Sequence, residues 1–135
     1  MAGYVLDSSA IVTLLFSEEG DETVREVLNT GENVLLPFIA MMEVQYKILR
    51  ARPDRFDDYM AYLDSWPAAV VESDPEWGRY AAEIKVPGKV SLADAWMAAL
   101  ALNRDAVLVH KDREFESVDE LKMLSLPCKP RAERT

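Results

Sequence analysis

The chain has 135 residues, half of them hydrophobic, and a formal net charge of −9. This length fits one domain, so residues 1–135 are expected to fold as a single unit. The hydrophobic content excludes an intrinsically disordered chain. The negative charge excludes a protein that holds nucleic acid by an overall basic field, but it leaves nucleic acid open as the substrate of a local site.

No feature of the sequence predicts membrane association or export. The longest apolar run, residues 34–42, is nine residues long and contains Pro37, whereas a membrane-spanning helix needs about 20 apolar residues. The N-terminus lacks the basic region and apolar core of a secretory signal peptide. Cys128 is the only cysteine, which excludes an intramolecular disulfide and favours a reducing compartment. We therefore expect a cytoplasmic protein without a membrane partner.

In the first half of the chain, short apolar segments alternate with segments of helical spacing. Capping residues, prolines and glycines mark where each helix begins and ends. In chain order the expected elements are a strand at 3–6, helices at 10–16 and 18–29, a strand at 33–36, and helices at 38–51 and 55–65.

The second half continues the alternation. The expected elements are a strand at 69–71, helices at 75–84 and 91–103, and strands at 106–110 and 122–126. Strands that alternate with helices indicate an α/β fold whose parallel sheet is covered on both faces. The strands are continuous apolar runs, as strands covered on both faces should be. Ligands of such folds bind beyond the carboxyl ends of the strands.

Four acidic residues lie in apolar sequence at positions that this fold brings to one edge of the sheet. Asp7 and Asp112 follow expected strands, at 3–6 and 106–110. Glu43 and Asp94 lie in the first turns of helices, and a helix that follows a strand begins at the same edge. Carboxylates are rarely buried unless they are paired or bind a metal. We therefore consider the four as one candidate site.

Each of these carboxylates also has a purely structural interpretation. The alternatives are an N-cap at Asp7, an ion pair of Glu43 with Lys47, a capping box of Ser91 with Asp94, and a turn or short-helix cap at Asp112. Four carboxylates that converge cannot all ionise without compensation, because like charges raise one another's pKa. A Mg²⁺ or Mn²⁺ ion, which prefers oxygen ligands, resolves this conflict and indicates phosphate chemistry.

Other catalytic arrangements find little support in the sequence. His110 is the only histidine and has no obvious nucleophile, so a Ser-His-Asp triad is excluded. A phosphate-cradling glycine-rich loop and a zinc-spaced Cys/His cluster are both absent from the sequence. A phosphoacceptor receiver domain is disfavoured. It needs an acidic pair after its first strand, where this chain has Asp7 followed by Ser8 and Ser9.

Four segments resemble the motifs of the PIN domain, particularly those of the ribonuclease toxins in VapBC-type toxin–antitoxin pairs. The segments are YVLDSSAI at 4–11, MEV at 42–44, LADAWMAALA at 92–101 and VHKDREF at 109–115. With chain length and element order, the resemblance covers nearly the whole chain. It implies a three-layer α/β/α fold with a central parallel sheet.

The resemblance also implies an activity. Asp7, Glu43, Asp94 and Asp112 fall on the acidic positions of the family, which are catalytic and surround one or two Mg²⁺ or Mn²⁺ ions. The implied reaction is endoribonuclease hydrolysis of RNA phosphodiester bonds by metal-activated water. The implied partners are an RNA substrate, a cognate antitoxin protein whose C-terminal segment crosses the pocket, and a second copy of the chain in a homodimer.

Hydroxyl and imidazole groups beside the acids are expected to position the substrate. Ser8 and Ser9 match the small hydroxyl residues that follow the first Asp of the family. His110 stands where the family usually has Thr or Ser, two residues before Asp112. This departure either weakens the site or supplies a different hydrogen bond, unless His110 is purely structural. The alternative function is accordingly a catalytically weak PIN-like module that binds RNA or protein.

A cluster of basic residues begins one helical turn after Glu43. It comprises Lys47, Arg50, Arg52 and Arg55. We expect the first three to line the approach to the acidic pocket and to bind RNA phosphates. The simpler interpretation of such a cluster is a solvated helix face.

Overall fold

The computed structural model describes residues 3–127 of the chain. At its centre is a five-stranded sheet with strand order β3-β2-β1-β4-β5. The strands are β1 (Tyr4–Leu6), β2 (Val34–Pro37), β3 (Ala69–Val71), β4 (Val107–His110) and β5 (Met123–Ser125). All four pairings are parallel, so every strand presents its carboxyl end to the same edge. The predicted α/β class with a parallel sheet is confirmed.

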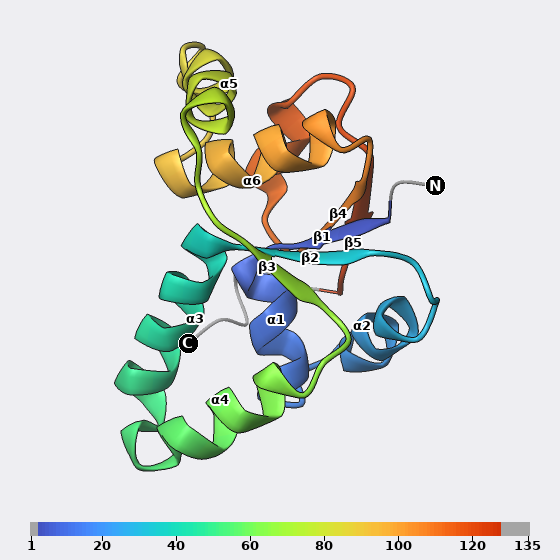
Figure 1. Cartoon of the computed structure of the whole chain (residues 1–135), viewed down its shortest axis with the longest axis vertical. Helices are drawn as coiled ribbons and strands as arrows, with labels where there is room; N and C mark the ends of the chain where they lie inside the picture. Colours follow the sequence, from blue (N-terminus) through green and yellow to red (C-terminus); the bar gives the residue numbers. More distant parts are fainter. Residues whose placement is uncertain (1–2, 128–135) are drawn as a thin grey trace.

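Helices cover both faces of this sheet. They are α1 (Ser8–Leu15), α2 (Asp21–Leu28), α3 (Phe38–Ala51), α4 (Phe56–Asp64), α5 (Pro75–Lys85) and α6 (Leu92–Asn103), with 3₁₀ turns η1 (Pro53–Arg55) and η2 (Arg113–Ser117). Figure 1 shows α5 and α6 on one side of the sheet and α1, α2 and α4 on the other. Helix α3 continues from β2 and packs against both α1 and α6. The three-layer α/β/α arrangement is therefore present.

The packing of α6 holds the acidic first turn of this helix close to the sheet. Its alanines at positions 95, 98, 99 and 101 are almost completely buried, and such small side chains let a helix approach neighbouring elements closely. The helix contacts β1, β2 and β4 on one side and α5 on the other. Its N-terminus is thereby held at the carboxyl edge of the central strands.

Two predicted helix starts are wrong. The helix expected from residue 10 begins at Ser8, directly after its N-cap Asp7. The helix expected from residue 18 begins at Asp21, because Gly20 has a left-handed backbone with φ 99°. The amide of Glu18 donates to the carbonyl of Thr13, and the amide of Asp21 donates to the carbonyl of Glu18. Residues 18–20 therefore form a turn between α1 and α2. Within residues 3–127, no helix has the length and apolar character needed to cross a membrane.

Candidate active site

Asp7 is held rigidly at the turn between β1 and α1. Its carboxylate accepts hydrogen bonds from the backbone amide of Ser9, at 3.2 Å, and from the Ser9 hydroxyl. The same Ser9 oxygen accepts a hydrogen bond from the amide of Lys111 at 3.0 Å, which ties this turn to the end of β4. Asp7 is only 3% exposed. The N-cap interpretation is correct, and the cap also fixes a buried carboxylate at the carboxyl edge of the sheet.

Glu43 approaches the same edge from the first part of α3. Burial raises its pKa, and the charge of Asp7 raises it further, while the Ser8 hydroxyl and the charge of Lys47 oppose these effects. Its Oε1 atom is buried and has no hydrogen-bond partner among the described residues. The ion pair of Glu43 with Lys47, the alternative structural interpretation of Glu43, is not formed. The Lys47 ammonium instead donates to Ser8 Oγ at 3.4 Å.

Asp94 takes part in only half of the expected capping box. Ser91 Oγ accepts a hydrogen bond from the Asp94 amide at 3.1 Å, and Ser91 is the N-cap of α6. The return bond comes from another segment, because Glu114 Oε2 accepts a hydrogen bond from the Ser91 amide at 3.4 Å. The Asp94 carboxylate is left to face the other acids, and its buried Oδ2 has no partner among residues 3–127.

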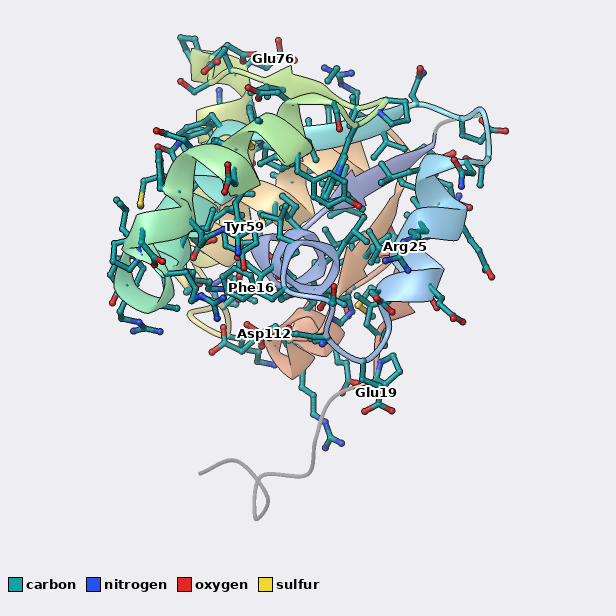
Figure 2. All side chains as sticks on the ribbon, turned by 90° about the horizontal axis from the view of Figure 1, so that it is seen from below. Phe16, Glu19, Arg25, Tyr59, Glu76 and Asp112 are labelled. Carbon is teal, nitrogen blue, oxygen red and sulfur yellow. The ribbon has the colours of Figure 1, made fainter. Side chains whose placement is uncertain are left out.

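Asp112 and Glu114 complete the cluster from η2. Asp112 Oδ1 caps this turn by accepting a hydrogen bond from the Glu114 amide at 2.9 Å, so the short-helix cap is confirmed. Carboxylate oxygens of Asp94, Asp112 and Glu114 lie within 4.8 Å of one another. Figure 2 shows Asp112 beside η2, in a view along the axis of α1. Glu114 was missed from the sequence, where its only signal is its place two residues after Asp112.

The electrostatics of the cluster show that its members interact. Burial raises the pKa of Asp7, and the charge of Asp112 adds to this increase. The pKa of Asp94 is raised to about 9, chiefly by burial and then by the charge of Asp7, with further contributions from Asp112 and Glu114. Like charges held together in a buried site disfavour full ionisation.

The residues present fit a hard divalent cation. Every available donor of the cluster is a carboxylate oxygen, which is the ligand type preferred by Mg²⁺ and Mn²⁺. The buried Oε1 of Glu43 and Oδ2 of Asp94 lack hydrogen-bond partners in the described part of the chain. A buried polar atom without a partner is costly, and a cation held among these carboxylates would offset part of that cost.

His110 lies at the end of β4 but faces the core. It is 1% exposed, its Nε2 atom is 3.4 Å from Ser125 Oγ, and its ring packs edge-on against Phe115 with centroids 5.1 Å apart. Burial lowers its pKa, so the neutral form is favoured. Among the described residues its ring forms no hydrogen bond with a carboxylate of the cluster. A role in substrate positioning stays a prediction, while the packing fits a structural histidine.

The basic residues of α3 lie at increasing distance from the acids. Glu43, Lys47 and Arg50 share one face of the helix, because residues four and seven apart fall on the same side. Arg50 is exposed and stacks on Tyr46, with its guanidinium carbon 5.0 Å from the ring centroid. Arg52 is exposed at the end of α3. Lys47 therefore lies at the rim of the cluster, and the two arginines extend outward from it.

The fold and the acidic edge define a class of protein that the sequence comparisons identify. Residues 4–121 match the family profile described as PIN domain, and the chain belongs to this family. PIN domains in general are nucleases that use divalent metal ions, a chemistry that the cluster of Asp94, Asp112 and Glu114 fits. A comparison with curated protein sequences found no match.

Solved structures that resemble this chain include two toxin–antitoxin complexes and a toxin. VapBC2 from Rickettsia felis, bound to a promoter DNA fragment, has a TM-score of 0.77 at 15% identity, covering 92% of this chain and 98% of that chain. DNA-bound VapBC from Salmonella typhimurium has a TM-score of 0.76 at 21% identity, covering 93% of this chain and 98% of that chain. VapC20 from Mycobacterium tuberculosis is a toxin that cleaves the sarcin–ricin loop. It has a TM-score of 0.73 at 15% identity, covering 93% of this chain and 100% of that chain. At these identities the similarity shows a shared fold.

Proposed function

We propose that this protein is a Mg²⁺- or Mn²⁺-dependent endoribonuclease that acts as the toxin of a toxin–antitoxin pair. The observation that carries the proposal is the convergence of Asp7, Glu43, Asp94 and Asp112 at one edge of the sheet. Buried oxygens of this set lack partners among the described residues, and the pKa of Asp94 is raised to about 9. Such a set is costly in isolation and becomes favourable around a divalent cation.

The four acids divide the work of holding metal by their burial and position. Asp7 and Asp94 are the most buried, so we assign them to the principal ion together with Glu43. Asp112, whose carboxylate oxygens lie within 4.8 Å of those of Asp94 and Glu114, completes this set or binds a second ion together with Glu114. A divalent ion held by these acids would supply positive charge for the phosphate and would activate water for hydrolysis. Hydrolysis of RNA is the reaction that this arrangement supports best.

The two serines after Asp7 have different roles in this proposal. The Ser9 hydroxyl is engaged by Asp7 and by the amide of Lys111, so it positions the metal-binding carboxylate. The Ser8 hydroxyl accepts a hydrogen bond from Lys47, and its proximity lowers the pKa of Glu43. Ser8 is therefore the better placed of the two to contact a substrate phosphate.

The partners are transferred from the structures that this chain resembles. VapBC structures contain a toxin with its antitoxin, and we propose a cognate antitoxin for this chain. A homodimer is supported by an exposed apolar face on α3, where Met42, Tyr46 and Leu49 are 56%, 54% and 53% exposed. An apolar patch of this kind marks a surface for a protein partner.

Cleavage of single-stranded RNA tests the proposed function. The purified chain with Mn²⁺ should cut a mixed-sequence RNA internally, and EDTA should stop the reaction because the acids would lose their cation. Products are resolved on a denaturing gel. Metal-independent cleavage would contradict the proposal. RNA binding without cleavage would favour the alternative, a catalytically weak PIN-like binding module.

Reversing the charge of the outer arginines should weaken RNA binding without disturbing the metal site. We expect Arg50→Glu with Arg52→Glu to raise the Kd for RNA and to flatten its dependence on salt, because fewer counterions are released. Fluorescence anisotropy with Ca²⁺ or EDTA, at several salt concentrations, measures both quantities. Unchanged affinity and salt dependence would show that this face of α3 is only solvated.

A further inference from the structure

Lys47 lies beside the acidic cluster but has no carboxylate partner among the described residues, in contrast to Lys111. Lys111 pairs with Glu18 at 3.5 Å, and Arg55 pairs with Asp58 at 3.0 Å. In the described part of the chain, Lys47 forms no ion pair. Its one hydrogen bond joins the ammonium to Ser8 Oγ at 3.4 Å. An ammonium has three donors, so most of its hydrogen-bonding capacity is unused.

The position of Lys47 is nevertheless fixed by the fold. It lies on α3 one helical turn after Glu43, on the same face of the helix, and it is only partly exposed. Ser8, its hydrogen-bond acceptor, is 4% exposed and directly follows Asp7. The ammonium is therefore placed between the turn that carries Asp7 and the helix that carries Glu43. Its charge acts on both of these carboxylates.

The charge of Lys47 lowers the pKa of Asp7 and of Glu43, but its donors stay largely unused until an anion arrives. If it served to neutralise Glu43, the favourable spacing of four residues should produce an ion pair, and it does not. A divalent ion among the acids would repel the ammonium and turn it outward from the carboxylates. A phosphate that bridges the ion and the rim of the cluster would lie against this ammonium and the Ser8 hydroxyl.

We propose that Lys47 is a catalytic residue that contacts a non-bridging oxygen of the scissile phosphodiester and stabilises the charge that develops there. This inference rests on the proposed nuclease function. It assigns Lys47 a part in the reaction itself, in addition to its place on the approach to the acidic pocket. Lys47 acts through its charge alone and takes no part in making or breaking a bond. It differs in this from Arg50, which would bind flanking phosphates of the RNA in ground state and transition state alike.

Lys47→Met tests the proposal because methionine keeps much of the side-chain length and apolar character without the charge. At saturating Mn²⁺, the single-turnover cleavage rate should fall by about 10²–10³-fold, as for other groups that stabilise developing charge. The RNA concentration for half-maximal rate should change little. The Kd for Mn²⁺, measured by calorimetry, should stay the same or decrease, because a positive charge beside the ion is removed. Lys47→Arg should restore part of the rate.

Two matched variants separate this role from general electrostatics. Arg50→Met, at a residue assigned to binding flanking phosphates, should raise the half-saturating RNA concentration by a larger factor than it lowers the saturated rate. Lys122→Met removes an exposed lysine that pairs with Asp105 at 2.7 Å, and it should change neither quantity. The proposal is overturned if Lys47→Met cleaves at the wild-type rate with saturating metal. It is also overturned if the variant merely binds Mn²⁺ more weakly and recovers its rate at high metal. A wild-type chain that does not cleave RNA would overturn the proposed function itself.

Discussion

Asp7→Asn should reduce RNA cleavage by about 10²–10³-fold or more, the range found when one electrostatic group is lost from an active site. Asp7 is the most buried carboxylate of the cluster, and its charge raises the pKa values of both Glu43 and Asp94. Its loss therefore removes a negative charge that interacts with both of these carboxylates. Asparagine keeps the size of the side chain but cannot supply a negative oxygen to a cation. The cleavage rate at a fixed Mn²⁺ concentration measures the effect.

The same substitution should leave the fold intact. Asparagine is as good an N-cap as aspartate, so its carbonyl oxygen can still accept the hydrogen bond from the Ser9 amide. Alanine would remove the cap and cost about 1 kcal/mol, which makes it a poorer test. Because burial raises the pKa of Asp7, its removal also relieves a cost in the metal-free protein. Thermal unfolding in EDTA should show a midpoint no lower than that of wild type.

Asp74→Asn is the matched control for this experiment. Asp74 is also an N-cap, accepting a hydrogen bond from the Trp77 amide at 2.9 Å at the start of α5, and it is exposed. Its substitution should leave cleavage unchanged. When it is expressed in cells without its antitoxin, the wild-type protein should arrest their growth, and the Asp7→Asn variant should not. An Asp7→Asn protein that cleaves RNA at the wild-type rate would refute the assignment of the site.

The strand-end acids could be predicted from sequence because one rule of geometry places them. Apolar runs define β1 and β4, and in a parallel sheet the residues after those runs share an edge, which gives Asp7 and Asp112. Glu43 and Asp94 followed from helices that begin at the same edge. Each local interpretation as a cap was also correct for Asp7 and Asp112. Capping and convergence are compatible, because a cap fixes the carboxylate where the chain turns.

The contacts that cross between distant segments could not be predicted in this way. The Ser91 amide is capped by Glu114, 23 residues away, instead of by Asp94 in its own turn. Lys47 prefers Ser8, 39 residues away, to Glu43 four residues away. Spacing in the sequence predicts the nearest residue as the hydrogen-bond partner. The packing of α6 on the sheet and of α3 on α1 instead determines which partner is within reach. Both exceptions lie at the candidate site.

Asp94 should make the stability of the metal-free protein decrease as pH rises. Its pKa is raised from 3.8 in the unfolded chain to about 9 in the folded protein, mainly by burial. Between these values the folded protein holds a proton that the unfolded chain has released. Stability then falls with rising pH, by up to about 1.4 kcal/mol per pH unit for one proton. The contribution is fully present below pH 3.8 and is lost as pH rises through about 9.

Mg²⁺ should reverse this trend, because a bound cation takes the place of the proton. At about 100 times its Kd, a ligand adds roughly 2.7 kcal/mol to stability, enough to raise the unfolding midpoint by on the order of 10 °C. The gain should increase with pH, since binding releases protons from the carboxylates. Calorimetry in buffers with different ionisation enthalpies counts the protons released.

Asp94→Asn should weaken the pH dependence and abolish the stabilisation by Mg²⁺. The variant should be more stable than wild type in EDTA at pH 8.5, since asparagine carries no charge into the cluster and keeps the size of the side chain. Its stability should depend less on pH, and Mg²⁺ should no longer raise its unfolding midpoint. Asp105→Asn is the control, because Asp105 is exposed and its pKa is lowered by Lys122. If Asp94→Asn keeps the full stabilisation by Mg²⁺, the carboxylate does not bind the ion, and the raised pKa of Asp94 then reflects burial alone.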